Sequence, residues 1–180
     1  MLFDFSSIFK LMSKDDSSLN VSVYLGTIYF NIFQNKRLQL KINISEALYY
    51  LISETLEDFI KEAEDKSKHE LFIITKYYNI ETKKFQDQYK IGFIKNQEKD
   101  KYKPYRFFIA DIKSNKSYSF IISSRVTYNI IKNDERPKFA DPNFSIRFFR
   151  YLWIKKLRKI LALSLDNELS QKRKQKYYKQ

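Results

Sequence analysis

Glycine is scarce in this chain, with only Gly26 and Gly92 among 180 residues. Phosphate-binding loops, nucleophile elbows and dinucleotide-binding turns need glycine where the backbone approaches a ligand or takes a positive φ. Because none of these motifs can be assembled, the sequence argues against a pocket that performs chemistry on a small molecule.

Cysteine is absent and histidine occurs once, as His69. The lack of cysteine excludes disulfides and cysteine-based zinc sites, and it fits an intracellular, reducing compartment, either cytoplasmic or organellar. His69 has no second histidine with which to share a metal, and no serine is set in the nucleophile elbow that a Ser–His–Asp triad needs. We therefore expect no enzyme activity, no catalytic residue, no metal site and no cofactor.

Long apolar runs are absent as well. Residues 1–12 are apolar but too short to span a bilayer, and Asp4 interrupts them. They also lack the basic start of a secretory signal. The sequence therefore predicts no membrane partner, and we interpret residues 1–12 as a packed strand or short helix.

Lysine, arginine, tyrosine and phenylalanine are abundant, and the formal net charge is +13. The hydrophobic fraction of 43% is enough to build a core, so the chain is not a disordered polycation. Charge is also unevenly placed: residues 46–66 carry seven carboxylates against two lysines, whereas residues 144–180 carry eleven basic side chains against two acidic ones. A one-sided basic field of this kind attracts an extended polyanion.

Periodicity predicts the elements. Alternation of polar and apolar residues, with β-branched or aromatic composition, predicts strands at 21–33, 37–44, 71–78, 85–94, 105–112 and 118–122. Gly26 inside the first of these indicates a bulge or a close backbone approach. Apolar residues at a spacing of 3.6 predict helices over 46–66 and 144–165. Residues 168–180 are too polar to pack and are expected to form a basic, flexible tail.

These elements predict an α+β fold with two antiparallel β-sheets, each backed by a long helix. Residues 1–167 would form a single domain of two β-sheet-plus-helix halves, about 1–67 and 68–167. Full apolar stripes on the helices and aromatic residues on both sheet faces leave hydrophobic surface that one chain of this size does not cover. We therefore expect a homo-oligomer.

Aromatic side chains beside cations on a sheet surface can stack unpaired bases and neutralise their phosphates. The strand cations expected to contact phosphates are Arg37, Lys41, Lys76, Lys90, Arg106 and Lys116. The candidate stacking residues are Tyr29, Tyr78, Tyr89 and Tyr105, because a partly exposed tyrosine tolerates water at its hydroxyl while offering a π-face. The C-terminal helix and tail add Arg158, Lys159, Lys172 and Arg173. Two alternatives stay open: the aromatic residues belong to the core, and the C-terminal cations form a solvated helix face.

A family resemblance enters at residues 23–63. Here a basic strand hairpin, VYLGTIYFNIFQNKRLQLKI, leads through Ser45-Glu46 into a long helix, ISEALYYLISETLEDFIKEA. This order resembles the single-strand-binding domain of the Whirly and positive cofactor four superfamily. Residues 71–165, four strands followed by a helix, are similar to a second copy of that unit. The resemblance implies a Whirly-like pseudo-repeat that binds single-stranded DNA or RNA over its sheets.

The resemblance supplies no site residue, because the lysine-glycine-lysine-alanine run of plant Whirly proteins is absent. The Pur-type repeat has a related order of strands and helix and is a near neighbour of this interpretation. The prediction is therefore sequence-tolerant, non-catalytic binding of single-stranded nucleic acid, with DNA and RNA both open.

Three alternatives remain at this point. The first is a structural or assembly subunit of a larger complex, which can include RNA, with the aromatics filling protein interfaces. The second is a metal-dependent nuclease, suggested by Asp111 two residues before Lys113, with Asp87 or Asp100 as a second acid. The third is attachment of the C-terminal cations to an anionic membrane surface.

Overall fold

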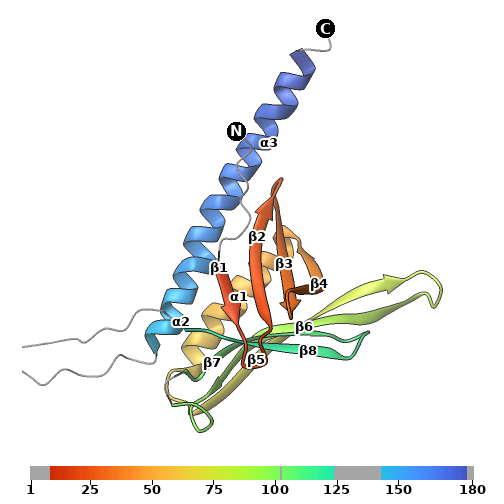
Figure 1. The fold of residues 1–180 in the computed structure, drawn as a ribbon. Helices are drawn as coiled ribbons and strands as arrows, with labels where there is room; N and C mark the ends of the chain where they lie inside the picture. Colours follow the sequence, from red (N-terminus) through yellow and green to blue (C-terminus); the bar gives the residue numbers. More distant parts are fainter. Residues whose placement is uncertain (1–8, 102, 124–142, 178–180) are drawn as a thin grey trace, which may run out of the picture. The chain divides into compact units, whose positions relative to one another are not determined.

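The computed structural model describes residues 9–101, 103–123 and 143–177 of the chain. Within these ranges the chain forms eight strands and two helical stretches (Figure 1). The strands are β1 (Phe9–Met12), β2 (Ser18–Tyr24), β3 (Thr27–Gln34), β4 (Arg37–Ile44), β5 (Lys68–Asn79), β6 (Lys84–Asn96), β7 (Tyr105–Asp111) and β8 (Lys116–Ile121). The helical stretches are α1 (Glu46–Ala63) and a continuous succession of α2 (Asn143–Arg150), the π-helical η1 (Tyr151–Leu157) and α3 (Arg158–Tyr177).

The chain divides into two compact units. Unit 1 consists of residues 1–51 and 151–180, and it holds β1 to β4 together with η1 and α3. Unit 2 consists of residues 52–150, and it holds most of α1, then β5 to β8 and α2. Unit 1 thus draws on both ends of the chain, which differs from the consecutive halves, 1–67 and 68–167, that the sequence suggests.

The expected fold of two antiparallel sheets, each backed by a long helix as in a Whirly-like pseudo-repeat, is wrong. All eight strands belong to one antiparallel sheet, in the order β4-β3-β2-β1-β8-β7-β6-β5. Helix α1 follows β4 in the sequence, yet its residues 52–63 belong to unit 2. The apolar stripe of a helix shows that one face is buried, but it does not say which strands bury that face.

In unit 1, two tight turns join the strands. β2 continues into β3 through Leu25-Gly26, and β3 continues into β4 through Asn35-Lys36. These four residues have φ values between 45° and 72°, as type I′ hairpin turns require. The single strand expected over 21–33 is therefore two strands joined at Gly26.

The core of unit 1 surrounds Trp153 of η1, the only tryptophan of the chain. The buried hydrophobic side chains of these strands all lie on one face of the sheet: Phe9, Leu11, Leu19, Val21, Val23, Ile28, Phe30, Ile32, Ile42 and Ile44. The rings of Phe9, Phe30 and Tyr49 lie 6.2, 5.7 and 5.6 Å from the Trp153 ring, centroid to centroid. Helix α3 is fixed to the β2–β3 turn by a hydrogen bond of 2.9 Å, donated by the Gly26 amide to the Ser164 hydroxyl.

In unit 2, the expected strands are confirmed, and their core face is aromatic. Phe93, Phe107 and Phe120 lie side by side on β6, β7 and β8, and all three are fully buried. Phe59 of α1 packs 5.6 Å from Phe93, and Phe149 of α2 packs 6.0 Å from Phe107. Both helices therefore cover the same face of these strands, which leaves the other face open to solvent.

A buried lysine joins α1 to the sheet of unit 2. Lys95 of β6 is 2% exposed, and its ammonium donates hydrogen bonds to the carbonyl oxygens of Ala63, at 2.6 Å, and Glu64, at 3.2 Å. These carbonyls are among the groups that the C-terminal end of a helix leaves without intrahelical partners. Burial lowers the pKa of Lys95 below its ordinary value, against the opposing effect of the Asp65 and Glu64 carboxylates.

We expect Lys95→Met to lower the free energy of unfolding by about 1–3 kcal/mol, because it removes the hydrogen bonds that the buried ammonium donates to the Ala63 and Glu64 carbonyl oxygens. Urea denaturation followed by circular dichroism measures this change. Since folding favours the neutral form of Lys95, wild-type stability should also gain on the variant as pH rises from the lowered folded-state pKa towards the ordinary lysine pKa. Lys99→Met, in the exposed loop after β6, is the control. Equal stability of the two variants would contradict the capping role.

The C-terminal helical stretch is longer than expected. It begins at Asn143, close to the expected start, but continues past residue 165 to Tyr177. Residues 168–177, for which the sequence suggests a flexible tail, are helical, and their lysine, arginine and glutamine content favours helix. None of the described helices offers an apolar stretch of the length that crossing a bilayer requires.

Candidate functional site

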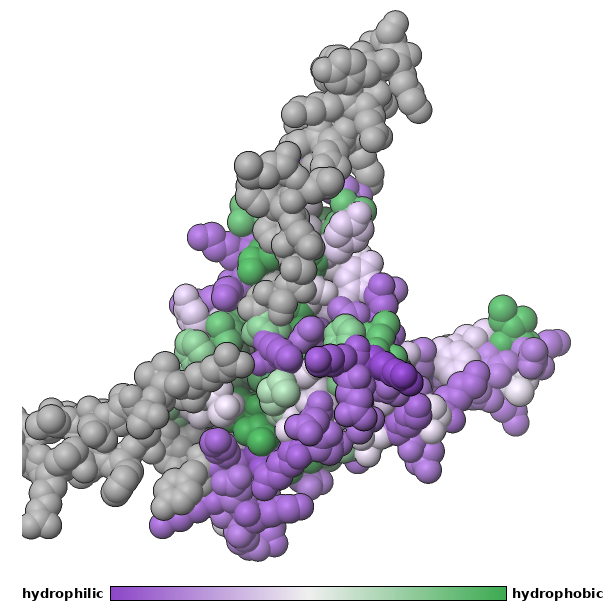
Figure 2. Space-filling view, viewed as in Figure 1, coloured by the Kyte–Doolittle hydropathy of each residue, from purple (hydrophilic) through white to green (hydrophobic). Residues whose placement is uncertain are grey.

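A two-stranded arm extends from the sheet of unit 2. Residues 76–79 of β5 and 84–87 of β6 pair only with each other, because the pairing of β6 with β7 begins at Tyr89. Figure 1 shows this hairpin continuing beyond the ends of β7 and β8. In Figure 2 its surface is mostly hydrophilic, with a hydrophobic group at the tip. In the part of the chain that the structure describes, no third strand pairs with this ribbon, and most of its side chains are exposed and accessible to a ligand.

One face of this hairpin is continuous along β5. Phe72, Ile74, Lys76 and Tyr78 alternate with residues of the opposite face, as the period of a strand requires. The register places them beside residues of β6 and, for Phe72, across Gly92 from Phe108 of β7. We call this surface the platform face, and it comprises Phe72, Ile74, Lys76, Tyr78, Phe85, Asp87, Lys90 and Phe108.

The outer end of the platform face carries an exposed aromatic pair. Tyr78 and Phe85 are directly paired across the two strands, with ring centroids 5.4 Å apart in an edge-to-face arrangement. Their side chains are 52% and 72% exposed. Lys76, on the same face, lies 3.7 Å from Asp87 in a solvent-exposed ion pair. Lys84 precedes Phe85 and is exposed, but the alternation of the strand places it on the opposite face. Aromatic surface that remains in water beside cations is unusual for a packed core and marks an interaction surface.

The inner end of the platform face carries a second aromatic pair. Phe72 and Phe108 lie on either side of Gly92, with centroids 5.4 Å apart. The Lys90 ammonium lies 4.0 Å from the Phe72 centroid and 5.9 Å from that of Phe108, within the range of a cation–π contact. All three side chains are half-buried. Gly92 has no side chain, so the two rings can meet over its backbone.

Of the residues proposed from the sequence, Lys76, Tyr78 and Lys90 lie on the platform face. Arg106 of β7 pairs with Ile94 on the same side of the sheet, but it is not free. Its guanidinium forms an ion pair of 3.4 Å with Asp100 and donates a hydrogen bond to a carbonyl of the same loop. Arg106 therefore holds that loop rather than offering a mobile cation.

The structure excludes Tyr105 as a stacking residue. It also separates the proposed stacking residue Tyr89 and the proposed phosphate contact Lys116 from the platform face. Tyr105 is 2% exposed, and its hydroxyl donates a hydrogen bond to Asn143, so it cannot stack a base. Tyr89 and Lys116 lie on the opposite side of the strands, in register with Asp111 between them. Burial, followed by the charge of Asp111, raises the pKa of the Tyr89 hydroxyl.

In unit 1, Tyr29 and Lys41 lie together on the face opposite the core. The Lys41 ammonium is 4.5 Å from the centre of the Tyr29 ring. Arg37 is exposed at the start of β4. Arg158 and Lys159 are exposed on α3. Lys172 and Arg173 belong to the same helix, but their side chains lie outside the described residues.

The carboxylates considered for a nuclease are engaged in other roles. The Asp111 carboxylate accepts hydrogen bonds from the Lys113 and Ser114 amides, at 3.1 and 3.4 Å, and from the Ser114 hydroxyl at 2.8 Å. These contacts build the β7–β8 turn. Asp87 and Asp100 form ion pairs with basic residues. Over the described part of the chain, no three metal-ligating side chains gather in one place.

The stacking residues proposed from the sequence did not include the phenylalanines of the platform face. Phe72, Phe85 and Phe108 contribute most of its aromatic surface, whereas the sequence interpretation favoured tyrosines. The signal was present, because Phe72 and Tyr78 share one parity with Ile74 and Lys76. Gly92 opposite Phe72 was the second signal, since glycine in a strand often marks a close approach.

No protein-family description, curated protein or solved structure matches this chain. Function is therefore inferred from the side chains described above. The resemblance to the Whirly and positive cofactor four superfamily stays a hypothesis based on the order of elements.

Proposed function

We propose that the protein binds single-stranded nucleic acid, DNA or RNA, without catalysing a reaction on it. The observation that carries the proposal is the exposed Tyr78–Phe85 pair beside lysines on the platform face. Unpaired bases present π-faces that stack on such rings, and each stacked base contributes about 1–3 kcal/mol. Bases in a duplex are already stacked on each other, so the same rings favour single strands.

The length of the platform face suits a short run of nucleotides. From Phe72 to Tyr78 the strand advances by six residues, or ~20 Å. A stacked strand advances by ~3.4 Å per nucleotide, so several nucleotides fit between the two aromatic pairs. Lys76 and Lys90 lie between these pairs and are positioned to neutralise phosphates. Lys90 now covers the Phe72 ring, and its flexible side chain can move to a phosphate as a base arrives.

Charge supplies the part of the affinity that does not depend on sequence. The net charge of +13 attracts a polyanion, and each phosphate contact releases counterions. For a single strand, the logarithm of the affinity should fall by about 0.7 per phosphate contact for each logarithmic unit of salt. The exposed Arg158 and Lys159 contribute to this attraction.

We expect Tyr78→Ala/Phe85→Ala to weaken single-strand binding by about tenfold or more, because two stacking rings are lost. Duplex binding should change little. Fluorescence anisotropy with a labelled oligonucleotide of about twelve nucleotides, single-stranded or paired, at two salt concentrations, measures both affinities.

Tyr24→Ala/Tyr50→Ala is the matched control, because these tyrosines of unit 1 are 65% and 63% exposed and lie outside the platform face. Equal affinity of wild-type protein for single strand and duplex would contradict the proposal. In that case the arm, whose tip residue Ile80 is 82% exposed, would be better assigned to a protein partner in an assembly. The expected self-association and the reducing compartment remain predictions from the sequence.

A further inference from the structure

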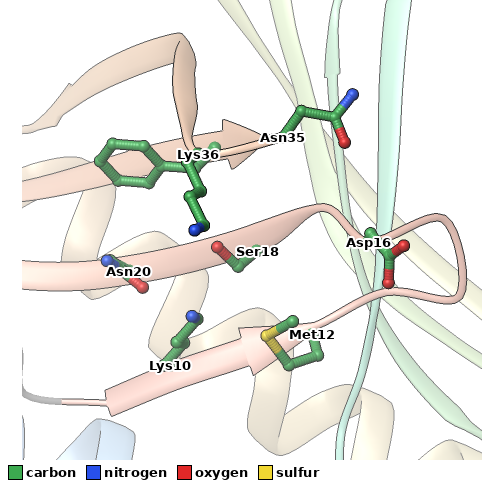
Figure 3. Close-up of a pocket in the computed structure, with 8 residues that line it drawn as sticks. Lys10, Met12, Asp16, Ser18, Asn20, Asn35 and Lys36 are labelled. Atoms are coloured by element: carbon green, nitrogen blue, oxygen red, sulfur yellow. The ribbon is translucent and has the colours of Figure 1, made fainter.

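A pocket of about 410 Å³ opens on the outer face of unit 1 (Figure 3). It lies between the end of β1, the start of β2 and the turn that joins β3 to β4. Its volume falls within the range of small-molecule sites in proteins. The pocket shares no residue with the platform face, because the platform face belongs to unit 2.

Two lysines meet at this pocket from different elements. Lys10 extends from β1 beside Asn20, and Lys36 extends from the β3–β4 turn over β2 towards Ser18 (Figure 3). Neither lysine takes part in an ion pair with the described residues. Among the described residues that line the pocket, Asp16 at the β1–β2 turn is the one that carries a carboxylate. Two unpaired ammonium groups and the Ser18 hydroxyl form a site for an anion such as a phosphate.

The floor of the pocket also contains an acceptor that can pair with a hydrogen-bond donor of a ligand. Asn20 pairs directly with Lys10 across the strands, and its Oδ1 atom is buried and has no hydrogen-bond partner among the described residues. A buried acceptor without a donor costs free energy, so a ligand that supplies an N–H or O–H is favoured there. A ligand that carries an amine beside its phosphate can pair with this oxygen and with the two lysines at the same time.

One side of the pocket is aromatic. Phe33 pairs with Ser18 in the neighbouring strand, so its ring stands on the same face as the polar groups, and it is half-buried. The pocket thus combines a planar apolar surface, a buried acceptor and paired cations. These groups match the parts of one nucleotide: a base that stacks and donates from its amine, and a phosphate.

We propose that this pocket binds one nucleotide, with its base against Phe33 and its phosphate between Lys10 and Lys36. The nucleotide is either a free mononucleotide or one unit of a single strand, and in the second form the inference rests on the proposed function. The pocket and the platform face carry different residues, so separate substitutions test the two.

The test is isothermal titration of the full chain with adenosine 5′-monophosphate, with inorganic phosphate and adenosine as fragments, and with a single-stranded oligonucleotide. We expect the mononucleotide to bind more tightly than either fragment. Lys10→Ala/Lys36→Ala should weaken its binding by about tenfold or more, since charged hydrogen bonds are lost. Phe33→Leu should weaken binding of the mononucleotide but not that of phosphate.

Lys61→Ala/Lys66→Ala is the matched control, because it removes two exposed lysines near the end of α1 and so changes the net charge equally. If Lys10→Ala/Lys36→Ala weakens binding of the oligonucleotide but not of the mononucleotide, the pocket binds one unit of a single-stranded nucleic acid. Phosphate binding as tightly as the mononucleotide would overturn the inference. The inference would also be overturned if the mononucleotide did not bind and the pocket variant kept the wild-type affinity for the oligonucleotide. Loss of affinity in Tyr78→Ala/Phe85→Ala but not in the pocket variant would support the platform face alone.

Discussion

Trp153→Ala is expected to lower the free energy of unfolding by about 3–5 kcal/mol, which makes it one of the most damaging single substitutions in the chain. Trp153 is fully buried and contacts the rings of Phe9, Phe30 and Tyr49. Its backbone carbonyl also accepts a hydrogen bond of 2.9 Å from the Tyr49 hydroxyl. An alanine would leave a cavity between η1 and the strands, which the surrounding β-sheet can fill only in part. Urea denaturation followed by far-ultraviolet circular dichroism measures the loss.

Two further variants make this expectation specific. Tyr151→Ala removes an aromatic ring two residues earlier in η1, where the side chain is 54% exposed, and it should cost much less. Trp153→Phe keeps part of the packing and should fall between the two alanine variants. A loss below about 1 kcal/mol for Trp153→Ala would mean that η1 does not pack on β1 to β4 as described.

The sequence was sufficient to place most elements, because strand and helix periods differ clearly in this chain. The helix over 46–66 and the strands at 71–78 and 85–94 appear as α1, β5 and β6 with small changes at their ends. For Gly26 the sequence suggests a bulge or a close backbone approach inside one strand. The close approach is present, because the Gly26 amide donates a hydrogen bond to Ser164 of α3, but the residue lies in a turn between two strands. Residues on both sides of it are β-branched or aromatic, and leucine precedes glycine where a type I′ turn usually has asparagine.

The arrangement of the elements was not predictable from local pattern. An apolar stripe such as Ile52, Leu56 and Phe59 shows that a helix face is buried, but the strands that cover it lie later in the sequence. The same holds for Trp153, which packs on strands more than a hundred residues away in the chain. Which elements pack against each other over such sequence distances depends on the shapes of the packed surfaces. Composition and residue spacing contain no information on those shapes.

The candidate site was predicted in part, and parity explains the errors. Tyr105 has the same parity as the buried Phe107 and Ile109, so the alternation of β7 already placed it in the core. Tyr89 and Lys90 are neighbours and must point to opposite faces, so both cannot serve one surface. A choice by face, in place of a choice by residue type, would have kept Tyr78 and added Phe72. Phe85 joins this face only because the register of β6 shifts at a bulge opposite Thr75 and Lys76, which the alternation along β6 does not show.

Gly92→Ala is expected to lower the free energy of unfolding of unit 2 by about 1–3 kcal/mol or more, because the added methyl group has no space. A Cβ atom at this position would lie 2.1 Å from the Leu71 carbonyl oxygen and 2.7 Å from the Cα atom of Phe72. Both obstacles are backbone, so β5 and β6 must move apart. That movement separates Phe72 from Phe108, and single-strand binding should therefore weaken under conditions in which the variant remains folded. Urea denaturation and fluorescence anisotropy measure the two effects.

Ser119→Ala is the control for Gly92→Ala. Ser119 pairs with Phe108 from β8, on the same side of the sheet, and it is exposed, so the change meets no backbone obstacle. Its stability and its affinity for single strands should stay close to those of the wild-type protein. If Gly92→Ala matched the control in stability, the close approach of β5 to β6 would be refuted. If it lost stability but kept full single-strand affinity, the inner aromatic pair would not contribute to binding, and the exposed Tyr78–Phe85 pair would have to supply the stacking alone.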